Sequence, residues 1–480
     1  MKSALPIPLR TLAEHLVAGL AALAVALHYG WDYGVDNQVI YLLGSLRVLD
    51  GQTLAHDWFT TTATHYHVAY GYLGAALIAL SERGMAVAIC AHVVVAAGLL
   101  ALYAMLRALD ARTALAAFLL VLCIVMVGDT RGAGATYVFD HILQPSTLAS
   151  AGLLLGAAFF AHGRFFLSGA CIAAAGMFHA NFLLLLYGAC VVAHVALGRA
   201  SLLPRLAAQL ALPTLVLLGQ VPLILRAAGG GPEADAARDV WMQIRAPHHY
   251  AVTRFQWQLA APMAGWLLVA LGGLATLRRH APVATLRAGA FIGGLVAVIW
   301  VGVAGAVLLQ SRSLTLLFSW RIGPHATLLM QTVAAGAAVH IALGRGVRTP
   351  GAALGATLAG LGVLSLFHAG DKDKTFIYLV LGAAAAAAAV RVLGEVAAAI
   401  PPVRRLWTGV APWLAAAGAA WFLLPHAVSG IEAATKRSTV LNGLRQQERE
   451  LFSFMRDKTP RDAVFLTPPN AEAVRFHGRR

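Results

Sequence analysis

The sequence has little charge. Asp, Glu, Lys and Arg together make up only 12% of its 480 residues, whereas hydrophobic residues make up 59%, and the mean hydropathy is +0.72. Water-soluble globular domains carry about 25% charged residues. The shortage of charge therefore excludes an ordinary soluble domain and indicates a protein whose solvent is largely the lipid bilayer.

The sequence is also poor in cysteine and in common enzyme signatures. Its four cysteines, Cys90, Cys123, Cys171 and Cys190, lie inside apolar runs without CxxC spacing. We therefore expect small core residues, and neither a disulfide framework nor a zinc site. The chain has no GxSxG, no HExxH and no GxGxxG between a strand and a helix. Hydrolases, metalloproteases and dinucleotide-binding enzymes with these motifs therefore lose support.

Apolar runs of about 15 to 20 residues recur along the chain, close to the length that crosses the hydrocarbon of a bilayer. Examples are Ala86–Leu106, Thr113–Val127 and Gly351–Phe367. Because unpaired backbone groups are costly in lipid, we expect helices, and the Leu and Ala content excludes the alternation of a β-barrel strand. The first run, Leu12–Leu27, lacks a small-residue cleavage site, so it is predicted to be a first helix and not a signal peptide.

The formal net charge is +15, and much of the positive charge falls in short segments between apolar runs. This placement indicates control of membrane topology and no nucleic-acid partner. With Lys2 and Arg10 in the cytoplasm, Tyr70–Leu80 must be an interfacial or re-entrant helix, since it is only about half a span long. The following arginines then all fall on the cytoplasmic side: Arg107, Arg112, Arg164, Arg199, Arg205, Arg278, Arg279, Arg345, Arg348, Arg404 and Arg405.

This topology predicts an all-α integral membrane protein with roughly 13 transmembrane helices, a cytoplasmic N-terminus and a periplasmic C-terminus. The transmembrane domain spans residues 1–428. It carries two large periplasmic loops, at about 30–84 and at about 227–258.

Residues 429–480 form a short periplasmic tail. The spacing of apolar residues from Leu441 to Met455 predicts an amphipathic helix, and Ala463–Leu466 has the pattern of a short strand. One helix and one strand bury too little surface for an independent core. We therefore interpret this tail as a truncated α/β domain or as a segment that packs on the membrane part.

Ionisable residues collect in the first loop. Asp32 and Asp36 are four residues apart, so they share a face if the segment is helical, and a carboxylate there has the chemistry of a general base. The alternative is an interfacial loop whose acids cap helices. Asp57, His65 and His67 are suited to binding phosphate or substrate or, alternatively, a divalent metal ion; solvated loop histidines are the third interpretation.

The second large loop carries Arg245, His248 and His249 beside Trp and Tyr residues. Cations beside aromatic rings suit a phosphate or diphosphate with a sugar stacked nearby; the alternative is a loop that anchors at the interface. Further polar residues fall on the same predicted side, namely Asp129, Arg131, Asp140, His141, Gln144, His179, Asn181, Arg312 and Arg321. We expect them to line one cavity, although each alone also fits a structural role, such as a hydrogen-bonded helix end for His179.

The layout resembles the GT-C superfamily of membrane glycosyltransferases: a first helix, a long outer loop with an acid just past the helix end, an interfacial helix and many later spans. The segments that carry the resemblance, also to a group of bacterial GT-C-like proteins, are Gly34–Gln38, Leu54–Phe59, Arg245–Tyr250 and Thr459–Pro469. Members such as protein O-mannosyltransferases and the lipid A aminoarabinose transferase use polyprenyl-phosphate-linked sugars. In two respects the chain departs from the pattern: Asn37 stands where the O-mannosyltransferases have a second acid, and the tail stops at Arg480.

The resemblance implies a glycosyltransferase of the bacterial inner membrane that transfers a sugar from a polyprenyl-phosphate-linked donor to an acceptor on the periplasmic side. Asp36 would be the catalytic base. Substrate and phosphate would be bound by Arg245, His248, His249, Asp57, His65, His67, Arg131 and His179. No residue is predicted as a metal ligand, and a divalent cation remains an open alternative. The donor and membrane lipid are the expected partners, while the acceptor stays open.

Two other classes of function remain open on the sequence. A polytopic transporter or lipid flippase would use the same polar residues to bind a substrate during alternating access. A non-catalytic assembly subunit would keep the fold without the chemistry.

Overall fold

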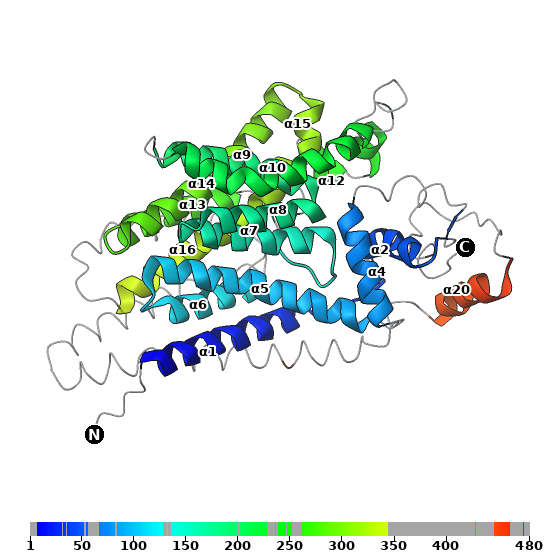
Figure 1. Ribbon diagram of the computed structural model, residues 1–480, viewed down its shortest axis with the longest axis horizontal. Coiled ribbons are helices and arrows are strands. Elements are labelled where there is room, and N and C mark those ends of the chain that lie inside the picture. The colour runs from blue at the N-terminus through cyan, green and yellow to red at the C-terminus, as the bar shows by residue number, and fades with distance from the viewer. Residues whose placement is uncertain are drawn as a thin grey trace.

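The computed structural model describes residues 7–30, 32–34, 36–51, 54–55, 67–81, 84–127, 132, 136–198, 202–227, 236, 239–245, 247–251, 261–343, 428, 446–460 and 474. Most of the described helices lie side by side along the long axis of the molecule (Figure 1). The described residues contain no named strand and only an isolated bridge between Gly132 and Thr136. The predicted all-α class is therefore confirmed for the part of the chain that the structure describes.

The helices in chain order are α1 (Ile7–His28), α2 (Asp36–Leu49), α4 (Val68–Leu80), α5 (Met85–Asp110), α6 (Ala114–Val127), α7 (Pro145–Ala161), α8 (Phe165–Phe178), α9 (Ala180–Ala196), α10 (Leu202–Ala227), the π-helix η2 (Trp241–Arg245), α12 (Pro247–Tyr250), α13 (Ala261–Leu277), α14 (Pro282–Leu308), α15 (Arg312–Leu317), the 3-10 helix η5 (Ser319–Ile322), α16 (Gly323–Leu343) and α20 (Gln446–Lys458).

Four helices have the length and the apolar composition to cross a membrane. They comprise Thr11–His28 within α1, the whole of α5 and α14, and Leu202–Pro222 within α10. Six further apolar helices of the described residues are shorter, at 10 to 17 residues. The run Gly351–Phe367 and the predicted strand Ala463–Leu466 lie outside the described residues.

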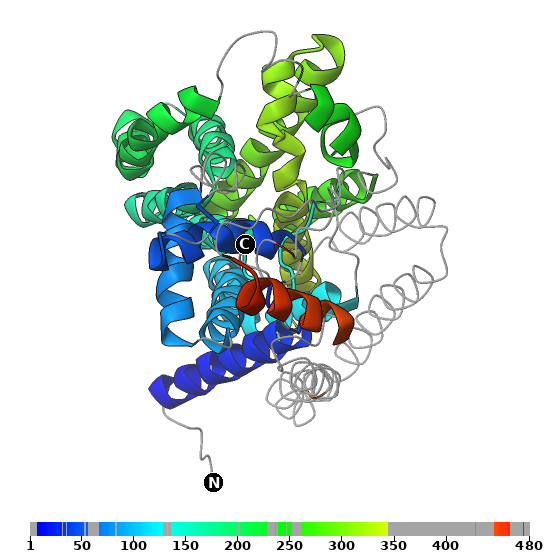
Figure 2. The same ribbon diagram turned by 90° about the vertical axis from the view of Figure 1, so that its right-hand side faces the viewer.

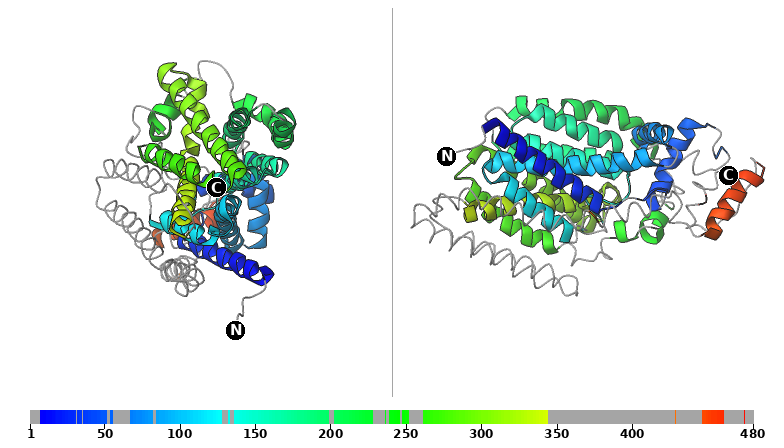
Figure 3. Two further views of the ribbon diagram at one scale, coloured as in Figure 1. Left: turned by 90° about the vertical axis from the view of Figure 1, so that its left-hand side faces the viewer. Right: turned by 90° about the horizontal axis from the view of Figure 1, so that it is seen from below.

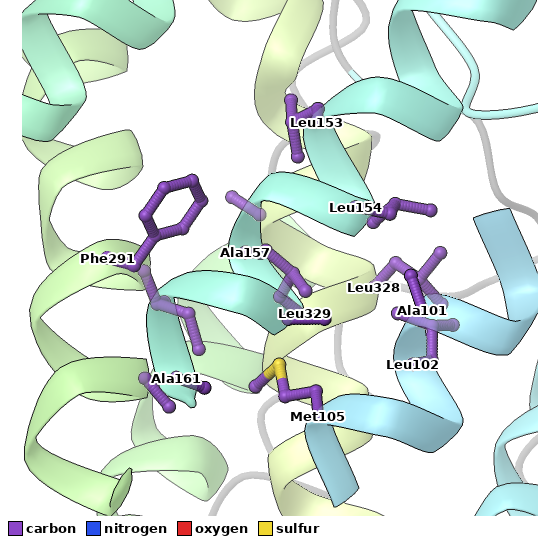
Figure 4. Close-up of a cluster of buried hydrophobic side chains, with 14 of the residues drawn as sticks. Ala101, Leu102, Met105, Leu153, Leu154, Ala157, Ala161, Phe291, Leu328 and Leu329 are labelled. Carbon is purple, nitrogen blue, oxygen red and sulfur yellow. The ribbon is translucent and has the colours of Figure 1, made fainter. Parts of the chain in front are cut away.

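The core of the bundle joins α5, α7, α14 and α16. Figure 4 shows Leu102 and Met105 of α5 near Leu154 of α7 and Leu328 of α16, and all four side chains are buried. Lipid tails are as apolar as leucine, so close packing more than exclusion from water holds such helices together in a membrane.

Small residues allow the closest helix crossings. A Cβ atom added at Gly169 of α8 would lie 1.8 Å from the backbone carbonyl oxygen of Gln209 in α10. Glycine removes the side chain that would keep the two backbones apart, as is common where membrane helices meet. The α8–α10 contact therefore depends on the absence of a side chain at this position.

Arginine side chains lie at one end of the bundle, where α5 ends and α8 begins. This is the end at the left in Figure 1. Arg107, near the end of α5, contacts His15 of α1 at 2.7 Å. Arg205 of α10 and Arg287 of α14 both lie over the ring of Phe165, the first residue of α8. We call this the basic end, and it brings together described arginines that the sequence places on one side.

The opposite end carries α2 and α4, with α4 running across the start of α5 (Figures 1 and 2). The predicted helix over Tyr70–Leu80 is observed as α4. Leu42 and Leu43 of α2 pack with Tyr70 and Ile78 of α4 in a second apolar cluster. This helix pair packs the described part of the first loop against the bundle.

Helix α20 lies beyond the α2–α4 end and far from the start of α1 (Figure 3). It confirms a helix over Gln446–Lys458, which overlaps the predicted segment from Leu441 to Met455. Phe452 and Met455 are buried as expected, whereas Leu451, predicted on the same apolar face, is 52% exposed.

Candidate functional site

Polar side chains gather at the end opposite the basic end, which we call the polar end. They come from the segment before α2, from His67 before α4, from residues 136–144 before α7, from the α8–α9 junction and from η5. These segments are far apart in the sequence.

A histidine lies between two carboxylates at the polar end. Nδ1 of His141 lies 2.6 Å from Asp140, and Nε2 lies 3.4 Å from Asp32. Burial raises the pKa of Asp140, but hydrogen bonds and the charge of His141 together with a hydrogen bond from Tyr137 outweigh it, so the pKa lies below its usual value. Asp140 is therefore ionised at neutral pH.

The segment that carries these residues is fixed by the start of α7. Gln144 and Thr147 form a reciprocal capping box, with Pro145 in the first turn, so the first free backbone N–H groups of the helix are partnered. The amide of Gln144 also donates to the Tyr137 hydroxyl at 2.6 Å. Burial and the nearby charge of Asp140 raise the pKa of Tyr137 well above its usual value, which keeps its hydroxyl protonated.

Helix α2 is joined to the same segment by a buried amide. Gln38 accepts from the backbone N–H of Gly34 at 2.7 Å and donates to the carbonyl of Leu143 at 3.1 Å. The Tyr70 hydroxyl donates to that same carbonyl at 2.6 Å. These bonds fix the start of α2, and hence the backbone of Asp36, beside the polar segment.

The condition under which Asp32 and Asp36 would share a helix face, a helix through both residues, is not met. Helix α2 begins at Asp36, whereas Asp32 precedes the helix and its backbone N–H donates to the carbonyl of His141 at 3.1 Å. Gly30 and Gly34 both have positive φ, which turns the chain between α1 and α2 and prevents one continuous helix. Asp32 therefore faces His141.

Two histidines predicted from the sequence meet at the polar end. The rings of His67 and His179 lie edge to face, with centroids 5.4 Å apart. Nδ1 of His67 donates to the carbonyl of Phe178 at 2.9 Å. Burial lowers the pKa of His67 to about 4, the bond to Phe178 opposes this, and the charge of Arg321 adds to the lowering. His67 is therefore neutral.

His179 lies between α8 and α9, as a helix-end residue, and is only 7% exposed. The predicted hydrogen bond is not made at Nδ1, which is buried and has no partner among the described residues. Burial, then the charges of Arg321 and His67, hold the pKa of His179 well below its usual value. A neutral imidazole therefore presents an unpaired nitrogen inside the site.

Arg321 is the cation whose charge lowers the pKa of both His67 and His179. Its guanidinium lies 5.4 Å from the centre of the Phe318 ring and 6.0 Å from that of Phe182. No carboxylate among the described residues lies within ion-pair distance of it. An arginine that stacks on aromatic rings and lacks a counter-ion is suited to binding an anion such as phosphate.

The loop that holds Arg321 also contacts the second large loop. Phe318, between α15 and η5, adopts a left-handed conformation with φ of 53°, which is strained for a residue with a side chain. The indole N–H of Trp320 donates to the carbonyl of His249 at 2.9 Å, and the rings of His249 and Phe318 lie 5.4 Å apart. His249 and Arg321 therefore approach the same phenyl ring.

The structure thus brings together three of the predicted site residues, His67, His179 and His249, around Phe318 and Arg321. The backbones of Asp36, Arg245 and His248 lie in α2, η2 and α12, and their side chains fall outside the described part of the structure. Asp57, His65 and Arg131 also lie outside it.

The sequence placed Arg321 and His141 among the polar residues expected to line one cavity and indicated Asp32 as a candidate base, but it assigned Arg321 and His141 no specific role. The signal for Arg321 was its position, with Arg312, at a short turn between two apolar runs. Within the described residues, no group of His, Cys, Asp or Glu has an arrangement that could hold a metal ion.

Comparison with known proteins finds no family model, no curated protein and no solved structure that matches this chain. The function must therefore follow from the chain's own side chains.

Proposed function

We propose that this protein is a membrane glycosyltransferase of the bacterial inner membrane. It transfers a sugar from a polyprenyl-phosphate-linked donor to an acceptor at the periplasmic face. In this proposal the basic end is cytoplasmic, because arginine-rich turns favour that side, and the polar end is periplasmic. The long apolar helices support the membrane placement.

The observation that carries the proposal is that a cation and an ionised carboxylate both lie at the polar end without forming an ion pair with each other. Arg321 is a cation without a carboxylate partner among the described residues, and Tyr137 lies near both it and the ionised Asp140. Glycosyl transfer from a lipid phosphate requires a cation for the leaving group and a carboxylate for the attacking hydroxyl. A cation and an ionised carboxylate thus lie at the polar end, and the bonds of Gln38 place the start of α2, with the backbone of the proposed base Asp36, at the same end.

In the proposed reaction the acceptor oxygen forms a bond to the anomeric carbon as the bond from that carbon to the phosphate oxygen breaks. The polyprenyl phosphate leaves with the electron pair of that bond, and Arg321, with Arg245, His248 and His249, stabilises its charge. The hydroxyl proton of the acceptor passes to the carboxylate of Asp36. Asp32, which precedes α2, and His141, which precedes α7, contact each other and orient the acceptor.

The experiment is transfer of radiolabelled sugar from membrane-extracted polyprenyl phosphosugars by the purified full chain. Wild type is compared with Asp36→Asn, in the presence and absence of a chelator. We expect turnover by the wild type and a loss of about 100-fold or more in the variant, because a general base contributes about that much.

Asp457→Asn provides the matched control, since Asp457 is an exposed acid of α20 whose carboxylate contacts Ser453 and Arg456 of the same helix. This control should transfer sugar like the wild type. Full activity in Asp36→Asn would overturn the proposed base, and no turnover from any donor would overturn the proposed transferase.

A further inference from the structure

The basic end contains a pair of arginines without a counter-ion among the described residues. The guanidinium of Arg205 lies 5.8 Å from the centre of the Phe165 ring, and that of Arg287 lies 5.5 Å from it. No carboxylate of the described residues is within ion-pair distance of either arginine. Two like charges that share one ring repel each other, and an anion held between them would relieve that repulsion.

The ring that carries the two arginines is held rigidly. Phe165 packs against the buried ring of His194 at 5.0 Å. His194 is paired with the side chain of Gln209 at 2.7 Å, and Gln209 in turn donates to Ser168 at 2.9 Å. This buried network joins α8, α9 and α10 with its polar groups partnered, so Phe165 is a fixed platform.

The turn between α7 and α8 leaves room for one of the guanidinium groups. Gly163 has a φ of 74°, and a Cβ atom added there would lie 2.3 Å from a guanidinium nitrogen of Arg287. Any other residue at this position would therefore displace Arg287 from the ring. Arg205, in contrast, is exposed at the surface.

Two exposed apolar side chains directly adjoin the cluster in the sequence, beside a further exposed arginine, Arg164. Phe166 is 53% exposed and follows Phe165, and Leu286 is 47% exposed and precedes Arg287. Free phosphate makes no favourable contact with exposed apolar side chains beside its site, whereas a phospholipid has both a phosphate and acyl chains that would contact them. The combination therefore favours a lipid.

We propose that Arg205 and Arg287, stacked on Phe165, bind the phosphate of an anionic phospholipid whose acyl chains lie along Phe166 and Leu286. The planar guanidinium groups donate paired hydrogen bonds to phosphate oxygens. This site rests on the membrane placement in the proposed function and is independent of sugar transfer. It lies at the opposite end of the bundle from Arg321.

The test is native mass spectrometry of the purified full chain with added phosphatidylglycerol, phosphatidylcholine or inorganic phosphate, in the absence of any sugar donor. Wild type should bind phosphatidylglycerol more tightly than phosphatidylcholine. Arg205→Gln, at an exposed position that leaves the packing intact, should weaken phosphatidylglycerol binding about fivefold, and Arg205→Gln with Arg287→Gln at least about tenfold.

The matched control removes two exposed arginines of the same end, by Arg112→Gln with Arg278→Gln, and should change binding less than about twofold. Unchanged phosphatidylglycerol binding in the Arg205 and Arg287 double variant would overturn the site. An equal loss in the control would also overturn it, since attraction would then depend only on net charge. Displacement of the lipid by inorganic phosphate at equal concentration would overturn the proposal that the bound phosphate group belongs to a lipid.

Discussion

The imidazole rings of His67 and His179 meet edge to face with centroids 5.4 Å apart, although one precedes α4 and the other joins α8 to α9. Burial and the charge of Arg321 lower the pKa of both. At the polar end the positive charge of Arg321 therefore acts on two neutral histidines, His67 and His179. An anionic ligand would meet one strong positive centre and imidazoles able to donate or accept hydrogen bonds.

The stability of the fold should depend on the protonation of His67. Its folded pKa of about 4 lies below the unfolded value of 6.5, so the unfolded state binds more protons between these pH values. Stability is fully present above pH 6.5 and falls as the pH drops towards 4. Between pH 7.5 and pH 5.0 this one group should cost about 2 kcal/mol of unfolding free energy.

Denaturant titrations of wild type and His67→Gln in detergent at these two pH values would measure this effect, which should be lost in the variant. His162→Gln, at an exposed histidine of the basic end, should keep the pH dependence of the wild type. An identical pH dependence in His67→Gln and wild type would contradict the prediction.

The variant Arg321→Gln should weaken binding of the phosphosugar donor. A charge-assisted hydrogen bond to phosphate contributes about 1.5–3 kcal/mol, so we expect KM for the donor to rise about 10-fold to 100-fold. Arg321→Lys keeps the charge but loses the stacking on Phe182 and Phe318, so its KM for the donor should lie between those of wild type and Arg321→Gln. Arg456→Gln, an exposed arginine of α20, is the control, and a KM in Arg321→Gln equal to the wild-type value would refute a phosphate-binding role.

The basic end should lose stability when Asp110 is neutralised. This buried carboxylate accepts from His340 at 2.8 Å and from Thr113 at 2.9 Å, and lies 3.5 Å from His280. It thereby joins the end of α5 to α16 and to the α13–α14 turn. Asp110→Asn should lower the unfolding free energy by about 2 kcal/mol. Asp457→Asn should change it by less than about 0.5 kcal/mol, and an equally small change in Asp110→Asn would argue against the junction.

The crossing of α8 and α10 should not tolerate a methyl group at Gly169. Its added Cβ atom would lie 1.8 Å from the Gln209 carbonyl oxygen, and a backbone atom cannot move away as a flexible side chain can. Gly169→Ala should therefore lower the unfolding free energy by about 1–3 kcal/mol. Gly293→Ala has open space at its Cβ position, so it should be neutral or stabilising, by at most about 1 kcal/mol. Thermal unfolding of both variants beside wild type would decide, and equal midpoints would exclude the predicted clash.

Local helix formation could be predicted from the sequence because it depends on the length and polarity of a single run. The predicted runs Leu12–Leu27, Ala86–Leu106 and Thr113–Val127 correspond to α1, α5 and α6, and the short run Tyr70–Leu80 corresponds to α4. The structure differs only at the ends, where caps and turns decide the last residues. The location of the described arginine clusters at one end of the bundle could also be predicted, because successive helices alternate in direction.

The partner of each polar residue could not be predicted, because it depends on contacts between distant segments. The spacing of Asp32 and Asp36 suggested one helix face, yet Asp32 lies outside the helix and contacts His141. That no carboxylate lies beside Arg321 in the described part of the structure could likewise not be predicted from the sequence.

The sequence by itself determined that this chain is a set of apolar helices with basic turns towards one end and polar segments towards the other, since hydrocarbon length and charge distribution act locally along the chain. Only the tertiary structure decided which polar groups meet. Helix packing buries His67 and His179 beside Arg321 and leaves that arginine without a carboxylate among the described residues, and burial then lowers the pKa of both histidines.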